Sequence, residues 1–165
     1  MSYLSPTLTL LVGAVKKATA SLDRDFNEIE KLQSSVRGYQ NFVSRSFERV
    51  AQTLKSELSR LRPDAVFVDG KPPLSRGCCF MVNPIDGMGN FVRGIPVFAT
   101  TVAYCENGEV KASVVYNRAS DELYFAEKGS GAYKEGFRNH ERLRVSAVKD
   151  GTAALVAASI GFQHG

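Results

Sequence analysis

Residues 83–96 read NPIDGMGNFVRGIP and separate two parts of the chain that differ in pattern. Before them, apolar residues recur at helical spacing; after them, short β-rich runs alternate with turn residues. Asn-Pro and Asp-Gly mark turns in proteins of any kind, and a single carboxylate is not an active site. On these residues alone, a plain turn is the favoured interpretation.

Two amphipathic helices are predicted upstream. The first covers residues 5–22, with one apolar stripe at gaps of three and four residues and Pro6 in its first turn. The second covers residues 43–61 and ends before Pro63. Residues 23–40 between them are polar and poorly patterned, so we predict no element there.

Short strands are predicted around and after the central stretch. Residues 97–105 and 110–116 form a hairpin through the Asn107-Gly108 turn. Further strands are expected at residues 65–68, 123–126, 131–134, 143–146 and 152–159. Helices followed by an antiparallel meander indicate an α+β fold.

Composition places the chain among ordinary globular proteins. It has 165 residues, 44% of them hydrophobic and 23% charged, which suits a single domain over residues 1–165. No apolar run reaches the ~18 residues of a membrane span, and the N-terminus lacks a secretory signal pattern. The three cysteines are odd in number and lack CxxC spacing, so we expect no disulfide framework, no zinc site and a cytoplasmic location.

The net charge of +4 is concentrated in one window. Residues 37–62 carry six basic and two acidic side chains. The net charge of this window therefore equals that of the whole chain. Arg45, Arg49 and Arg60 lie opposite the apolar stripe of the second helix and form a possible anion face. A solvated helix surface is the favoured alternative, and we expect no nucleic-acid partner because aromatic residues are not interleaved.

Read with its flanks, the central stretch resembles the signature of the inositol monophosphatase family, Asp-Pro-Ile/Leu-Asp-Gly-Thr-x-Asn-Phe. A further resemblance lies upstream at residues 41–44, and others follow in order at residues 112–116, 122–126, 129–132 and 143–146. The resemblance covers residue 8 to the end of the chain. It implies the N-terminal half of the family fold, two long helices packed on a largely antiparallel sheet. It also implies a homodimer, with the family's C-terminal domain absent after its first strand.

The resemblance further implies a site. Family members hydrolyse phosphate monoesters with Mg²⁺ held by carboxylates and one backbone carbonyl. The matching metal positions here are Asp86, the carbonyl of Ile85, and Asn83, which stands where the signature has Asp. Gly87 and Met88 match positions whose backbone contacts substrate. Inositol or sugar phosphates are the implied substrates if the chain is active.

Other departures concern the remaining ligands and the attacking water. Gly70-Lys71 replaces the family's Glu-Glu, with Asp69 as an alternative ligand if the loop shifts. Met88 and Phe47 replace the Thr and Asp that polarise water, and Phe47 is expected in the core. The late Asp motif does not occur in the sequence. We therefore expect no Mg²⁺ binding, or only weak binding.

The remaining chemistry-bearing residues give weak signals. His140 and His164 have no partner in sequence and are expected at the surface. Cys78 and Cys79 are expected as free cysteines entering a strand. Residues 129–131 lack the Lys-Ser/Thr of a phosphate loop, and Arg93 is expected to be exposed.

Three functions remain open. The first is a non-catalytic remnant of the phosphatase, and the second is a residual phosphomonoesterase acting on inositol or sugar phosphates. The third is a binding module for an anionic partner such as RNA. The replaced ligands favour the first.

Overall fold

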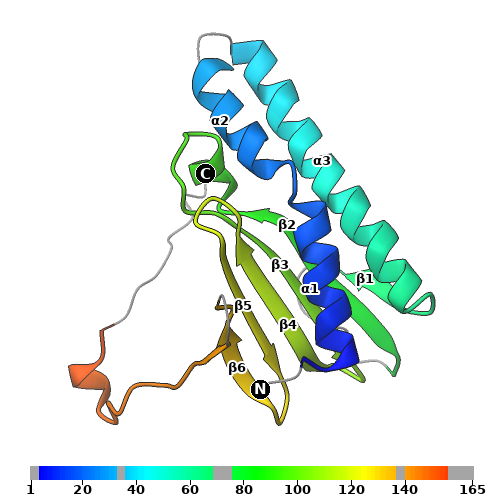
Figure 1. Ribbon diagram of the computed structural model, residues 1–165, viewed down its shortest axis with the longest axis vertical. Helices are drawn as coiled ribbons and strands as arrows, with labels where there is room; N and C mark the ends of the chain where they lie inside the picture. The colour runs from blue at the N-terminus through cyan, green and yellow to red at the C-terminus, as the bar shows by residue number, and fades with distance from the viewer. Residues whose placement is uncertain (1–3, 33–35, 69–75, 137–139, 156–165) are drawn as a thin grey trace.

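A computed structural model describes residues 4–32, 36–68, 76–136 and 140–155. Within these residues, seven strands form one sheet in chain order, with helices against one face (Figure 1). β1 (Val66–Val68) pairs with β2 (Cys78–Asp86) in parallel, and every other neighbouring pair is antiparallel. The α+β class and the largely antiparallel sheet are thereby confirmed.

The predicted hairpin forms the centre of the sheet. β3 (Ala99–Glu106) and β4 (Glu109–Asn117) are joined by Asn107 and Gly108, whose φ angles of 52° and 77° both lie in the left-handed region. Such a pair of angles makes the turn that matches the twist of two antiparallel strands. The later strands are β5 (Glu122–Glu127), β6 (Gly131–Lys134) and β7 (Glu141–Arg142).

Two helices cover one face of the sheet as predicted, although the first ends at Ala18 and not at residue 22. α1 (Pro6–Ala18) begins after Ser5, whose hydroxyl accepts a hydrogen bond from the Leu8 amide at 3.1 Å. α3 (Val36–Leu61) ends before Pro63. None of the helices in the described residues is both long and apolar enough to cross a membrane.

The absence of an element in residues 23–40 was predicted wrongly. α2 (Leu22–Leu32) occupies part of this stretch, and α3 already begins at Val36. Over residues 22–29, the part of α2 whose side chains are described, the buried positions are Leu22, Asp25 and Ile29, so a carboxylate interrupts the apolar stripe. Arg49 of α3 compensates this charge, with Nη2 at 3.1 Å from the Asp25 carboxylate. The periodicity is helical, but one of its inward positions is charged.

The core lies between the helices and the sheet. α1 and α3 pack against each other, and they contact β4 and β2 respectively. Fully buried residues come from all of these elements. The largest fully buried side chains, which come from further elements as well, are Leu11, Val15, Leu22, Ile29, Val50, Leu54, Leu58, Phe80, Phe91, Val102, Tyr116 and Leu123.

The segment after the sheet differs from the prediction. Residues 143–146 are not a strand: β7 ends at Arg142, and Leu143 donates one backbone hydrogen bond to Ala132 at 2.8 Å. Gly151–Ala153 forms a 3₁₀ turn, and residues 152–155 are exposed. Residues 152–155 are therefore not part of a buried strand. Without a neighbouring strand, the apolar composition of these residues is insufficient to form one. The rest of that predicted strand, 156–159, lies outside the described residues.

The Asp25–Arg49 pair gives a test of the packing of α2. Arg49→Met keeps the alkyl stem but leaves the Asp25 side chain, 2% exposed, without its main counter-charge. We expect a loss of about 2–3 kcal/mol in the free energy of unfolding, measured with urea. Arg45→Met, at an exposed position one turn earlier, should change stability by less than about 0.5 kcal/mol. Equal effects of the two substitutions would contradict a stabilising role for this pair.

Candidate functional site

The predicted site begins where β2 ends. Asn83 and Asp86 are both exposed, and the Asn83 side-chain amide donates a hydrogen bond to Asp86 Oδ1 at 3.2 Å. Residues three apart on a regular strand point to opposite faces. The pairing of β2 with β3 is irregular between these two residues, which allows their side chains to meet.

This irregular backbone is held from inside the protein. The buried hydroxyl of Thr100 donates a hydrogen bond to the Pro84 carbonyl at 2.7 Å. The Ile85 side chain is 3% exposed and belongs to the core. The segment is therefore anchored by one buried hydrogen bond and one buried side chain while its polar ends face outward.

A tight turn and a short helix follow. Gly87 has a φ of +77°, and α4 (Met88–Phe91) starts directly after it. A Cβ atom on Gly87 would lie 2.9 Å from the Val97 carbonyl oxygen. The Asn90 side-chain amide donates to that same carbonyl at 2.7 Å. Glycine is required here both by the backbone angle and by the close approach of the following loop.

The short helix is fixed to the core by aromatic packing. Phe91 is fully buried, and its ring meets that of Phe98 edge-on at a centroid distance of 4.9 Å. Phe26 of α2 packs against both rings, at 6.0 Å from Phe91 and 5.2 Å from Phe98. The helix missed by sequence reasoning thus supports the candidate site. The spacing of Leu22, Phe26 and Ile29 was the available signal.

The two positions that correspond to the family's water activators carry apolar side chains that pack in the core. Phe47 and Met88 are each half-buried and pack against the core cluster, which confirms the expected placement of Phe47. Phe47 and Asn83 line one cavity of about 580 Å³ together with residues of β1 to β4. Neither a phenyl ring nor a thioether can take a proton from water.

The described residues do not fit a magnesium site of the family's type. Three or more His, Cys, Asp or Glu side chains placed to hold a metal ion are found nowhere in the described part of the chain. Asp86 is the single carboxylate in residues 83–91, and one of its oxygens already accepts the Asn83 amide. Asp69, Gly70 and Lys71 lie outside the described residues.

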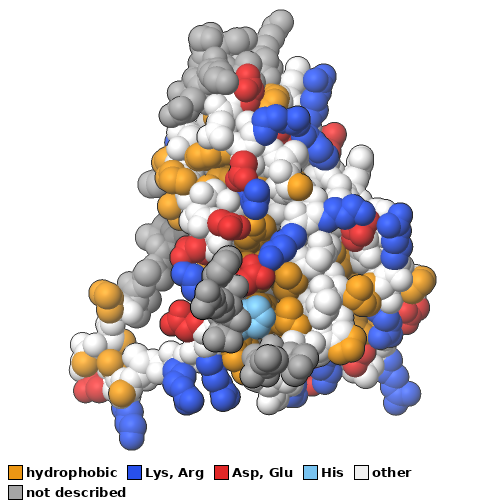
Figure 2. Space-filling view, viewed as in Figure 1, with side chains coloured by type: hydrophobic (Ala, Val, Ile, Leu, Met, Phe, Trp, Pro, Cys, Tyr) orange, Lys and Arg blue, Asp and Glu red, His pale blue; other side chains and the backbone are white. Residues whose placement is uncertain are grey.

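The three arginines of the possible anion face have different surroundings. Arg49 turns toward α2 and pairs with Asp25, while Arg60 pairs with Glu57 at 3.2 Å. Arg45 is exposed. Figure 2 shows Lys and Arg side chains interleaved with Asp and Glu over the visible face. These residues do not form one unpaired basic surface.

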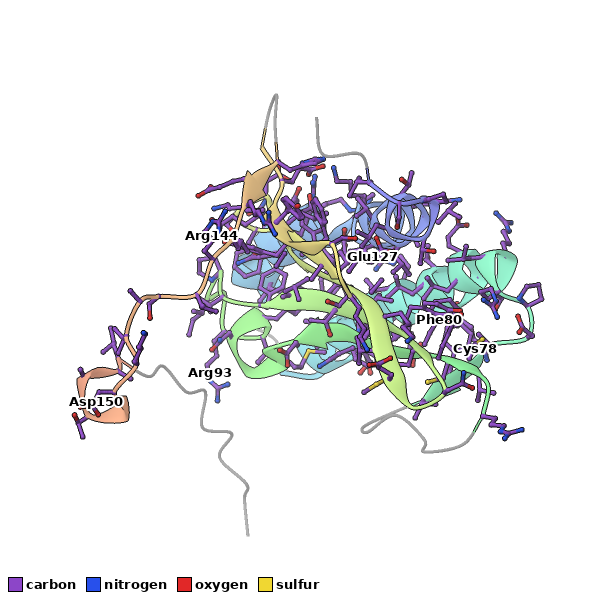
Figure 3. The ribbon with its side chains drawn as sticks, turned by 90° about the horizontal axis from the view of Figure 1, so that it is seen from below. Cys78, Phe80, Arg93, Glu127, Arg144 and Asp150 are labelled. Atoms are coloured by element: carbon purple, nitrogen blue, oxygen red, sulfur yellow. The ribbon has the colours of Figure 1, made fainter. Side chains whose placement is uncertain are left out.

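Several weaker expectations can be compared with the structure. His140 is half-buried and meets the Phe125 ring edge-on at 5.0 Å, so its placement at the surface was wrong. Arg93 is exposed as expected and donates to the Gly89 carbonyl at 2.8 Å (Figure 3). The turn at residues 129–131 joins two strands, and no helix follows it there. His164 lies outside the described residues.

Comparison with known proteins identifies the family. The model of the inositol monophosphatase family matches residues 3–165. Inositol-1-monophosphatase of Rhizobium meliloti is 41% identical over 161 residues, which are 95% of this chain and 58% of that protein. The chain therefore belongs to the inositol monophosphatase family, and it spans about 58% of the length of this curated relative.

Another relative has a different name, and a third protein has a solved structure. Nus factor SuhB of Vibrio cholerae is 27% identical over 163 residues, which are 96% of this chain and 60% of that protein. The crystal structure of the extragenic suppressor protein suhB from Bartonella henselae superposes with a TM-score of 0.71 at 34% identity. That match covers 87% of this chain and 56% of the other, which supports the fold described above.

The two glycines beside the site provide a matched pair of variants. Gly87→Ala should destabilise the protein by about 2 kcal/mol or more, because alanine disfavours this φ and its methyl group meets the Val97 carbonyl. Gly89→Ala should be neutral or slightly stabilising, since only the end of the Arg93 side chain lies nearby, at 3.5 Å. Urea denaturation measures both, and a neutral Gly87→Ala would rule out the proposed constraint.

Proposed function

We propose that this chain is a member of the phosphatase family that lacks Mg²⁺-dependent phosphomonoesterase activity. The observation that supports this most directly is the hydrogen bond from the Asn83 amide to Asp86 Oδ1. At a metal centre, both side chains would have to offer oxygen to the ion. Here one of them directs N–H groups at the remaining carboxylate.

Charge strengthens the proposal. Mg²⁺ gives up hydration water reluctantly and is bound in proteins through carboxylates that offset its charge. Replacing an aspartate by asparagine removes one negative charge and leaves a neutral amide. The segment then offers Asp86 and the Ile85 carbonyl, too little to hold the ion tightly.

The attacking nucleophile is affected independently. Hydrolysis of a phosphate monoester requires a water molecule that is deprotonated as it attacks. Phe47 and Met88 occupy the two positions that correspond to the family's water activators, and their side chains pack against the core. Metal binding and water activation are therefore both altered, as expected when a whole function is lost.

The family's substrate class would apply if activity were retained. The relatives named inositol-1-monophosphatase favour inositol phosphates in that case, and the relative named fructose-1,6-bisphosphatase/inositol-1-monophosphatase favours sugar phosphates as well. Self-association as a homodimer stays a prediction from the family resemblance.

A second candidate is a non-catalytic binding function. The relatives named Nus factor SuhB favour it, because a protein named as a factor need not act as an enzyme. The ion pairs of Arg49 and Arg60 argue against α3 as an anion surface. An RNA titration followed by fluorescence anisotropy tests this candidate. We expect no binding of RNA.

Magnesium binding can be tested through thermal stability. At about 10 mM Mg²⁺ the melting temperature of the unchanged chain should match that in NaCl of equal ionic strength. Asn83→Asp should lower stability without Mg²⁺, because two carboxylates then lie side by side, and Mg²⁺ should restore about 2–4 °C. A specific Mg²⁺ shift in the unchanged chain that Asp86→Ala removes would refute the proposal.

Activity gives a separate test. With inositol-1-phosphate and excess Mg²⁺, the unchanged chain should release no phosphate above background. The Asn83→Asp/Met88→Thr double variant should also stay inactive, because Phe47 still stands where the family has its second water activator. The Rhizobium meliloti relative serves as the positive control. Turnover by the unchanged chain would show that other residues supply the missing groups.

A further inference from the structure

Three sulfur atoms gather on the side of the sheet that faces away from α1 and α3. Along β2, the side chain of Phe80 belongs to the helix-covered core, so Cys79 and Met81 on either side of it point to the opposite face. Cys105 of β3 lies directly opposite Cys79 in the strand register. All three residues therefore share one face of two neighbouring strands.

The distances and burial fit a cluster. Cys105 Sγ lies 3.7 Å from Met81 Sδ. Cys79 and Cys105 are 4% and 1% exposed, while Met81 is half-buried. Burial raises the pKa of the Cys105 thiol to about 11, and the adjacent Cys79 thiol adds to the increase. All three cysteines are free.

We propose that Cys79, Cys105 and Met81 form a binding site for one soft monovalent metal ion of the Cu(I) class. Thiolate and thioether sulfur are the donors that select Cu(I) among biological metals. Two sulfurs bound at about 2.3 Å to the same ion in a trigonal plane lie about 4 Å apart. The observed 3.7 Å between Cys105 and Met81 is close to that spacing.

The donor set also disfavours other metals. Zn²⁺ takes four ligands from Cys, His, Asp and Glu, and groups of three or more such residues are missing from the described part of the chain. Mg²⁺ and Ca²⁺ require oxygen ligands. Binding of a monovalent ion by two thiolates releases two protons and leaves a net charge of −1 in a buried site, a cost that the affinity of Cu(I) for thiolate sulfur has to offset.

The neighbouring Cys78 provides a matched control. It is adjacent to Cys79 in sequence, but its side chain packs on the helix-covered side with Phe80 (Figure 3). Its sulfur accepts a hydrogen bond from Arg62 Nη2 at 2.6 Å and a weaker one from the Tyr104 hydroxyl at 3.6 Å. Cys78→Ser therefore removes a thiol of the same segment without touching the three-sulfur cluster.

The experiment titrates the reduced chain with Cu(I) without oxygen, in competition with bathocuproine disulfonate. One equivalent should bind. Cys79→Ser and Cys105→Ser should each weaken binding by roughly 100-fold or more, and Met81→Leu by roughly 10-fold. Cys78→Ser should leave the affinity unchanged.

Each other outcome overturns the site. Equal weakening by Cys78→Ser would indicate the vicinal pair Cys78–Cys79, and an unchanged affinity in Met81→Leu would reduce the site to a dithiol. A chain that loses two hydrogens by mass spectrometry instead of binding the ion would show a disulfide. Circular dichroism checks folding of every variant; if both serine variants unfold, the comparison of Met81→Leu with Cys78→Ser still decides.

Discussion

The irregular pairing of β2 with β3 between Asn83 and Asp86 is the constraint on which the candidate site depends. It brings two side chains together that a regular strand would separate, and it lets the chain turn at Gly87. The buried Thr100 hydroxyl stabilises the irregularity from within. The Phe91 ring packs against Phe26 of α2 and against Phe98, the residue before β3, and so fixes the exit of the segment. Sheet, helices and site are thus joined at one short stretch of chain.

Much of the fold was predictable from local patterns. The apolar stripe of α3, the stop at Pro63 and the Asn107-Gly108 turn each reflect a single local rule, and each prediction is confirmed. α2 was missed although Leu22, Phe26 and Ile29 have helical spacing, because Asp25 occupies an inward position and its partner Arg49 belongs to a different helix. The prediction of two C-terminal strands was wrong because it relied on composition alone. Residues 143–146 and 152–155 have suitable composition, but a strand also requires a neighbour.

The site was predictable only as far as residue identity allows. The replacement of expected acids by Asn83, Phe47 and Met88 can be read from the sequence, and so can the core position of Phe47. Pro84 signals that the strand is irregular here. That the Asn83 and Asp86 side chains meet follows only from the register of β2 and β3. The same limitation applies to Cys79 and Cys105. They are far apart in the chain, and only the register of two strands makes them neighbours.

The proline after Asn83 has a chemical consequence for the lifetime of this site. Asparagine converts spontaneously to aspartate when the next backbone nitrogen attacks the side-chain amide and forms a succinimide. Pro84 has no N–H to lose, so this route to a carboxylate is closed at position 83. Asn107, by contrast, precedes Gly108 in an exposed turn, where the attack is least hindered. Chemical ageing of the protein should therefore add charge to the hairpin tip while the amide beside Asp86 persists.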